Sequence, residues 1–289
     1  MFDGFSRKRI ETSEAVINLV QGGSGPPVLM LHGYPQTHAC WHKIAPRLAE
    51  RFTVVCADLR GYGDSSKPAG DAGHHNYSKR AMARDQAEVM SALGFERFSV
   101  AGHDRGARVA HRLALDHAER VTRLALLDIV PTRKAFASMN QKLAAADYHW
   151  FFLVQPHDLP ERLIGNDPYF YLRWTLEHWA GTPGALTPAA VAEYRRCFDA
   201  ATIRATCEDY RAAATIDLEH DAADADRKLA CPLLLLWSAD GTGSHFDVPA
   251  AWRECSENGV RGRALDCGHF LAEERPEEVA AELAAFLSE

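Results

Sequence analysis

Several features are scarce or missing in this chain of 289 residues. Lysine and arginine (32) are fewer than aspartate and glutamate (39), and no basic run occurs, which argues against nucleic acid as a partner. No window approaches the roughly eighteen apolar residues that cross a bilayer. The N-terminal residues contain no continuous apolar segment before a cleavage site, so we expect no secretory signal.

The cysteines also give no sign of being paired. There are seven, and they occur singly: Cys40, Cys56, Cys197, Cys207, Cys231, Cys255 and Cys267. This odd number, without a C-x-x-C pair or a metal-ligand spacing, predicts neither a disulfide framework nor a metal site. We therefore expect buried, reduced thiols in a cytoplasmic protein, and no metal or cofactor.

Short apolar runs, each bounded by Gly, Pro or Asp, recur along the chain. They cover residues 26–33, 52–59, 97–103, 124–130, 231–238 and 262–269. Near-continuous apolar runs of this length are typical of strands buried on both faces of a parallel sheet. Residues 8–22 read as two antiparallel strands of an N-terminal hairpin.

Helical patterns lie between these runs, at residues 81–94, 105–117 and 276–289. Pro276 and the two glutamates after it suit the first turn of the last helix. Alternating strands and helices predict a doubly wound α/β fold, with a mostly parallel, eight-stranded sheet flanked by helices.

The rhythm changes between residues 132 and 226, where helix-like segments are rich in aromatic residues. We interpret this region as a helical cap inserted into a core made of residues 1–131 and 227–289. The acidic stretch 217–228 is expected to be a solvated loop that returns the chain to the sheet.

The stretch "VAGHDRGAR" (residues 100–108) joins a predicted strand to a predicted helix. Glycines on both sides of Asp104 fit a tight turn that holds one side chain out at the end of a strand, similar to the nucleophile elbow of α/β-hydrolases. The usual serine is replaced here by Asp104, which we take as the candidate nucleophile. The alternative is that Asp104 only caps the following helix.

Two other strand ends carry candidate catalytic groups. The His32–Gly33–Tyr34 turn would aim the Tyr34 N–H, together with the Arg105 N–H, at an oxyanion. His269 follows the last predicted strand, as the base of an α/β-hydrolase does. The acid that orients His269 is Asp128, which we prefer, or Asp240, which also suits a turn.

The chain resembles the fluoroacetate (haloacetate) dehalogenases of the α/β-hydrolase superfamily over essentially its whole length. The resemblance rests on "HGYPQT", "DLRGYGDSSKP", "GHDRGAR", "YHWFF", "CEDYRA" and "CGHFLAEE" in this order. It implies Asp104 as nucleophile, His269 as base and Asp128 as its partner. It also implies a carboxylate clamp of Arg105 and Arg108, halide-binding His149, Trp150 and Tyr210, pocket-lining Trp179, and a homodimer.

The residue types suit this chemistry. Guanidinium groups can fork a substrate carboxylate, and Trp and Tyr can donate a hydrogen bond to a departing halide. Attack by Asp104 on a saturated carbon would give an ester. Water can then attack the carbonyl carbon of this ester and hydrolyse it. A serine would instead form an ether without a carbonyl. The expected reaction converts a haloacetate to glycolate and halide.

Other functions remain open. An epoxide hydrolase would use the same nucleophile, base and acid, and Tyr169, Tyr171 and Tyr210 are candidate cap acids for it. The paired arginines argue against a neutral epoxide as substrate. A protein of this fold that binds a small acid without turning it over is the third possibility. The sequence does not say which halogen is released, nor the size and chirality limits of the substrate.

Overall fold

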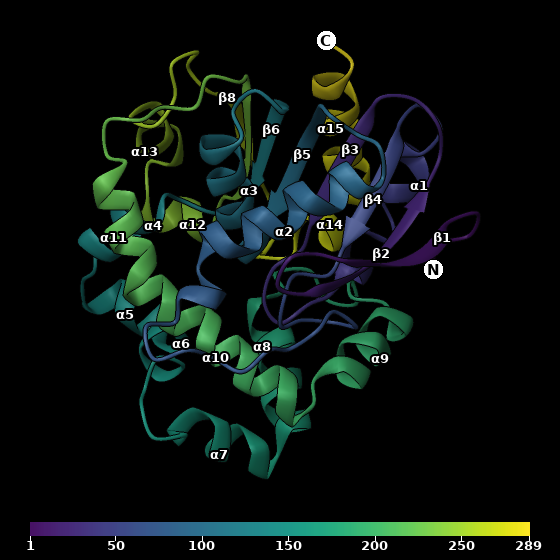
Figure 1. Ribbon diagram of the computed structural model, residues 1–289. Helices are drawn as coiled ribbons and strands as arrows, with labels where there is room; N and C mark the ends of the chain where they lie inside the picture. The colour runs from purple at the N-terminus through teal and green to yellow at the C-terminus, as the bar shows by residue number, and fades with distance from the viewer.

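The computed structural model describes residues 1–289, and one eight-stranded sheet runs through its centre (Figure 1). The strand order is β1-β2-β4-β3-β5-β6-β7-β8. β2 pairs antiparallel with β1 and β4, and the remaining neighbours are parallel. The strands are β1 (Ser6–Glu11), β2 (Val16–Gly22), β3 (Pro27–Leu31), β4 (Thr53–Ala57), β5 (Phe98–His103), β6 (Val121–Leu127), β7 (Leu233–Ser238) and β8 (Arg261–Leu265).

The predicted strands and N-terminal hairpin are confirmed, with shifts at their ends. β6 begins at Val121 rather than at residue 124, and it ends at Leu127, so that Asp128 is the first residue beyond it. β8 is the last strand of the sheet, and residues 261–264 are exposed, contrary to the prediction of a strand buried on both faces. Charged side chains such as Arg263, which pairs with Glu278 and Glu282, suit a sheet edge.

Helices cover the sheet in the positions that the alternating pattern predicts. In Figure 1, α2 and α3 lie across the face of the sheet that is turned to the viewer. The elements outside residues 132–226 are η1 (His38–Trp41), α1 (Ala45–Leu48), η2 (His75–Tyr77), α2 (Lys79–Ala92), α3 (Arg105–Asp116), α12 (Thr242–His245), α13 (Val248–Arg253), α14 (Leu271–Glu274) and α15 (Pro276–Leu287). The predicted helices 81–94, 105–117 and 276–289 correspond to α2, α3 and α15.

Eight consecutive helices separate β6 from β7 and gather along one end of the sheet (Figure 1). We call them the cap, and the exact limits at 132 and 226 stay a prediction. They are α4 (Thr132–Ala137), α5 (Gln141–Ala146), α6 (Tyr148–Phe152), α7 (Leu159–Asn166), α8 (Pro168–Trp179), α9 (Pro188–Cys197), α10 (Ala200–Ala214) and α11 (Ile216–Ala223).

The prediction of a solvated loop at 217–228 is wrong for its first half, which forms α11. Asp217 is buried there, and its carboxylate accepts a hydrogen bond of 2.8 Å from the Lys79 N–H at the start of α2. The Asp224 carboxylate pairs with Arg80 and Arg112. The acidic residues therefore serve as ion-pair partners of the core, which a count of charges along the sequence does not reveal.

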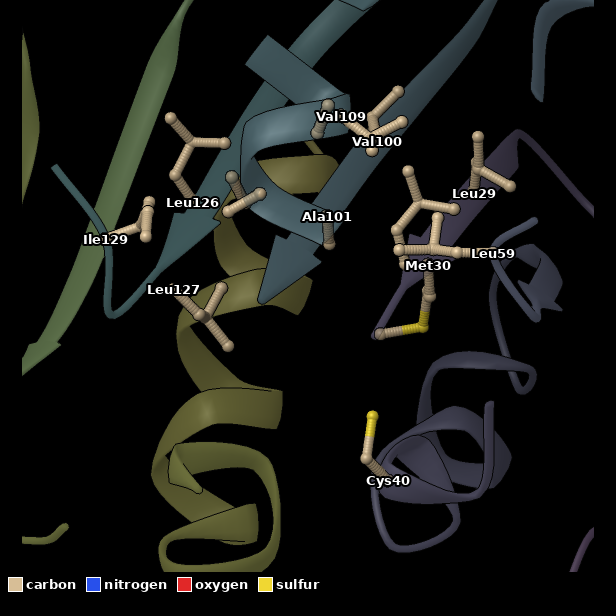
Figure 2. Packing of buried hydrophobic residues seen from close by; sticks show 14 of the residues in the cluster. Leu29, Met30, Cys40, Leu59, Val100, Ala101, Val109, Leu126, Leu127 and Ile129 are labelled. Carbon is tan, nitrogen blue, oxygen red and sulfur yellow. The ribbon is translucent and has the colours of Figure 1, made fainter. Parts of the chain in front are cut away.

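The core lies between the parallel strands and the helices on them. Figure 2 shows Leu29 and Met30 of β3, Val100 and Ala101 of β5, and Leu126 of β6 converging in this layer. These strands are buried throughout apart from their ends, so each one is held in place on both faces.

The start of α3 lies unusually close to the end of β3. A Cβ atom on Gly106 would overlap the carbonyl oxygens of His32 and Leu31, and one on Gly102 would lie 2.7 Å from the Cα of Ala107. Only glycine permits this approach. It brings the residue between these glycines, Asp104, against the turn that follows β3.

All seven cysteines are free thiols, and none of the helices combines the length and apolar character that crossing a membrane requires. The cytoplasmic location stays a prediction.

Candidate active site

The candidate catalytic residues all follow the carboxyl ends of parallel strands. Tyr34 follows β3, Asp104 follows β5, Asp128 follows β6 and His269 follows β8. Parallel strands end at one edge of a sheet, so these four residues meet there despite their separation in sequence. Asp104 has a φ of 47° and Asp128 has a φ of 49°, values that residues other than glycine rarely adopt. Strain at both positions marks a site where the surrounding fold dictates the backbone.

One oxygen of Asp104 is held and the other is free. The Tyr34 N–H donates a hydrogen bond of 2.9 Å to Oδ2. A Cβ on Gly33 would lie 2.6 Å from the Cβ of Asp104, so this approach also requires glycine. Oδ1 accepts no hydrogen bond from the protein. Arg105 is the first residue of α3, and its N–H is the other expected oxyanion donor. This N–H donates a hydrogen bond to no group of the protein.

The His269 imidazole lies between two carboxylates. Its Nδ1 is 2.7 Å from Oδ2 of Asp128, and its Nε2 is 4.0 Å from Oδ2 of Asp104. The Ser238 N–H donates to the other oxygen of Asp128 at 2.9 Å, which fixes that carboxylate. Asp240 lines the same cavity without bonding to His269. The geometry thus favours Asp128 over Asp240 as the partner of His269, and the catalytic roles remain proposals.

Charge coupling sets the protonation of this group. Burial alone would lower the pKa of His269, but the carboxylates of Asp104 and Asp128 outweigh burial and raise it to about 10. Burial would likewise raise the pKa of Asp104, but His269, His103 and Arg105 hold it well below its usual value. At neutral pH the site therefore holds an Asp104 carboxylate beside a His269 imidazolium.

Arg108 presents an unpaired cation to the cavity. Its side chain is buried and forms no ion pair; Nη1 donates to Thr132 Oγ1 at 2.6 Å, and Nε is buried without a partner. Burial and the charge of Arg105 lower its pKa to about 10, so the guanidinium is still charged at neutral pH. A buried charge without a counterion is unfavourable, and an anionic ligand would relieve this.

The Arg105 side chain turns away from the cavity. Its Nε and Nη2 donate to the two carboxylate oxygens of Asp209 at 2.9 and 2.8 Å. The guanidinium carbon lies 4.1 Å from the centre of the Tyr210 ring. Asp209 also accepts hydrogen bonds from Tyr62 and Lys79. Only Nη1 of Arg105 remains without a protein partner.

Sequence reasoning missed Asp209. The signal was present, since Asp209 lies in the "CEDYRA" segment directly before Tyr210, a predicted site residue. A second missed residue is Asp147, whose carboxyl lines the cavity and forms no hydrogen bond. Burial raises the pKa of Asp147 to about 6.

The predicted halide-binding residues gather around one aromatic cluster. The centre of the His149 ring is 4.5 Å from that of Trp179, 5.6 Å from Tyr210 and 6.2 Å from Trp150. His149 and Trp150 belong to the five-residue helix α6, so both can border one cavity. Burial lowers the pKa of His149 to about 3, so its ring is neutral and carries one N–H.

These residues surround a cavity of about 620 Å³ between core and cap. Asp104, Arg108, His149, Trp150, Trp179 and His269 contribute to its wall, whereas Tyr34, Arg105 and Tyr210 are not among the residues that line it. The volume is within the range of small-molecule sites. No group of three or more His, Cys, Asp or Glu side chains is arranged to hold a metal ion. The absence of a cofactor stays a prediction.

The tyrosines of the rival hypothesis differ in position. Tyr169 is exposed and stacks on Arg195, away from the cavity wall. The Tyr171 hydroxyl is buried without a hydrogen bond. The Tyr210 ring lies 5.3 Å from the ring of Tyr34, the residue that donates to Asp104. Tyr210 is therefore the best-placed of the three relative to Asp104, the predicted nucleophile.

Comparison with known proteins agrees with this fold. Residues 26–276 match the alpha/beta hydrolase fold family, to which the chain belongs. The chain is 46% identical over its full length to a fluoroacetate dehalogenase from a Burkholderia species, of which it covers 96%. It is 38% identical over 91% of its length to a soluble epoxide hydrolase from Corynebacterium sp. strain C12, of which it covers 90%. A crystal structure of a protein from Nostoc sp. PCC 7120, described as an alpha/beta hydrolase, is 60% identical in sequence and superposes with a TM-score of 0.98. The match covers 100% of this chain and 99% of the Nostoc chain.

We predict that the folded protein loses stability as the pH rises from 6.5 towards 10. The pKa of His269 is near 6.5 in the unfolded chain and about 10 in the folded one, so only the folded state keeps the proton in this range. The stabilisation is complete below pH 6.5 and disappears as the pH passes 10. Urea unfolding across this range measures it. The decline should be smaller in Asp104→Asn, which removes one of the two carboxylates; equal slopes in both proteins would contradict the assignment.

Proposed function

We propose that this protein is a hydrolytic dehalogenase that cleaves the carbon–halogen bond of small 2-halo carboxylates, such as haloacetates. The observation that carries the proposal is the buried Arg108 guanidinium, which has no carboxylate partner and lines the same cavity as Asp104. It suits the carboxylate of a substrate whose neighbouring carbon is attacked by Asp104. The 46% identity to a fluoroacetate dehalogenase supports this reaction class.

The carboxylate clamp is proposed to be unequal. Arg108 offers Nε and Nη2, neither of which bonds within the protein. Arg105 can add only Nη1, because Asp209 occupies its Nε and Nη2. Both guanidiniums contribute positive charge, but Arg108 supplies most of the hydrogen bonds.

In the first step, Oδ1 of Asp104 attacks the carbon that bears the halogen. A new carbon–oxygen bond forms, and the halide departs with the electrons of the bond that breaks. His149, Trp150 and Tyr210 are proposed to donate hydrogen bonds to it. Their hydrogens replace the hydration that the halide lacks in a buried site, and fluoride requires this most.

In the second step, His269 acts as base. Formation of the ester removes the negative charge of Asp104, so the pKa of His269 falls and its proton is lost to solvent. Neutral His269 then takes a proton from water, whose oxygen attacks Cγ of Asp104. The N–H groups of Tyr34 and Arg105 stabilise the oxyanion. The ester bond breaks, the 2-hydroxy acid leaves after taking up a proton, and the Asp104 carboxylate is restored.

An epoxide hydrolase is the second candidate, favoured by the 38% identical relative and by the unbonded Tyr210 hydroxyl. Opening an epoxide needs an acid such as Tyr210 for the departing oxygen, and a neutral epoxide has no use for the Arg108 charge. A protein that binds a small acid without turnover is the third candidate. Halide and diol assays separate all three.

We expect the wild-type protein to release halide from chloroacetate and fluoroacetate and to form no diol from styrene oxide. Arg108→Gln should raise KM for chloroacetate by about 10- to 100-fold, because a charge-assisted hydrogen bond is lost. Arg162→Gln, which removes an exposed charge from α7, is the matched control and should leave KM unchanged. Formation of diol from styrene oxide without release of halide would establish an epoxide hydrolase. Saturable binding of a haloacetate without any product would establish a non-catalytic binding protein.

The ester intermediate predicts where the oxygen of water goes. After one turnover in ¹⁸O-labelled water, mass analysis should find the label in the peptide that contains Asp104, because water attacks Cγ of that residue rather than the substrate. Unlabelled substrate turned over by pre-labelled enzyme should then carry ¹⁸O into the hydroxy acid. Label that goes directly into the product of the first turnover would indicate direct attack by water.

A homodimer is the assembly that we propose, and the surface of the cap supports it. Large apolar side chains are exposed on three neighbouring cap helices: Phe151 on α6, Leu159 and Leu163 on α7, and Tyr169, Phe170 and Trp174 on α8. Phe170 and Trp174 border a surface hollow of about 430 Å³. Exposed apolar side chains on neighbouring helices are typical of a protein–protein interface.

Light scattering after gel filtration should give the mass of a dimer for the wild type. The double substitution Leu163→Glu and Phe170→Glu should give a monomer, since it places charges in the apolar surface. Ala285→Glu, on the exposed face of α15 at the opposite end of the molecule (Figure 1), should remain a dimer. A wild-type monomer, or a double variant that still dimerises, would refute this interface.

A further inference from the structure

Glu274, the last residue of α14, is a buried carboxylate without an ion-pair partner. Its Oε2 accepts hydrogen bonds from the N–H groups of Gly181 (2.9 Å), Thr182 (2.7 Å) and Gly268 (2.9 Å). Its Oε1 accepts one from the Phe270 N–H at 3.0 Å. Four backbone donors therefore compensate its charge, which makes each bond strong and the carboxylate hard to replace.

The four donors come from two segments. Gly181 and Thr182 lie in the cap loop that follows α8, whereas Gly268 and Phe270 lie on either side of His269. The two segments touch directly, because a Cβ on Gly181 would lie 2.5 Å from the Gly268 nitrogen. The His269 N–H itself donates to the Trp179 carbonyl oxygen at 2.8 Å.

Three consecutive amides, at 268, 269 and 270, are thus bound either to Glu274 or to the cap. This fixes the backbone that carries His269, while Asp128 fixes only the Nδ1 end of its ring. A backbone shift of about 1 Å can cost a reaction on the order of 100-fold in rate. The placement of the base therefore depends on Glu274 as well as on Asp128.

We infer that Glu274 is a positioning residue that couples the cap loop at 179–182 to His269 and keeps the imidazole aligned for hydrolysis of the ester. The inference rests on the proposed function. Because Asp104 performs the first step without His269, loss of Glu274 should slow the second step selectively. Glu274 touches neither substrate nor reacting atoms.

The test is Glu274→Gln with chloroacetate. The glutamine side chain has one acceptor oxygen, which can take the place of only one of the two Glu274 oxygens. Its NH2 group takes the place of the other oxygen and then faces one or more backbone N–H groups, so that donors oppose donors. We expect a burst of halide equal to the enzyme concentration, then a kcat about 10- to 100-fold lower. KM should fall with kcat, so that kcat/KM, which reports the first step, is nearly unchanged. Mass spectrometry should detect the accumulated ester on Asp104.

Glu273→Gln is the matched control. Glu273 is the preceding residue, equally buried, and it bonds to Gln36 and Tyr194 rather than to the base loop. Burial raises its pKa to about 8, so it is protonated at neutral pH and glutamine resembles it closely. It should show neither a burst nor a change in the ratio of kcat to KM.

Several outcomes would overturn the inference. A merely structural role would lower kcat and kcat/KM together, through loss of active protein, without a burst. Wild-type kinetics in Glu274→Gln would refute it as well. If that variant does not fold, Glu274→Asp is the substitute, because it keeps the charge on a shorter side chain. It should also lower kcat with little change in kcat/KM, by a smaller factor, and unchanged kinetics would refute the inference.

Failure of the proposed function is a separate result. It would appear as a wild-type protein that releases no halide. In that case hydrogen exchange at the amides of residues 181, 182, 268 and 270 still tests the coupling. Faster exchange at both segments in Glu274→Gln than in Glu273→Gln supports it, and equal exchange overturns it.

Discussion

The Asp104 carboxylate is the group around which the rest of the site is arranged. It is held at a φ of 47°, in a conformation that costs on the order of 1–3 kcal/mol for a residue with a side chain. Gly33 lets the turn after β3 approach it closely, Gly102 and Gly106 let β3, β5 and α3 approach one another, and the Tyr34 N–H binds one of its oxygens. Burial then strengthens its coupling to His269, so that the proposed nucleophile and the proposed base form one electrostatic unit.

Two further carboxylates attach the cap to this unit. Asp209, on α10, binds the Arg105 side chain directly beside the nucleophile, and Glu274 ties the loop after α8 to the loop that carries His269. The cap is therefore joined to both sides of the catalytic centre. A shift of the cap would act on His269 and on Arg105 together, rather than only opening or closing a cavity.

The relatives act on two kinds of electrophile, as their names state. The nucleophile, base and acid proposed for this chain would suit either one. What differs between the two reactions is the group that receives the departing atom and the charge of the substrate. The neutral, buried His149 and the unpaired Arg108 favour a halide as leaving group and an acid as substrate. Tyr210 suits both, because its hydroxyl can donate a hydrogen bond to a halide or a proton to an alkoxide.

The sequence by itself determined the alternation of strands and helices, the elbow at Asp104, the turn at Tyr34 and the strand end at His269. These features depend on periodicity and on the small set of turns that glycine allows, both of which act over a few residues. Shifts of strand ends, as in β6, are the expected error of such patterns.

Only the tertiary structure decided which groups meet. It paired His269 with Asp128 rather than with Asp240, across 141 residues of sequence. It directed Arg105 to Asp209, exposed β8 at the sheet edge, made a helix of residues 216–223 and gathered four amides around Glu274. A hydrogen bond needs two atoms within about 3 Å. No local pattern specifies which distant segments the fold brings to that distance.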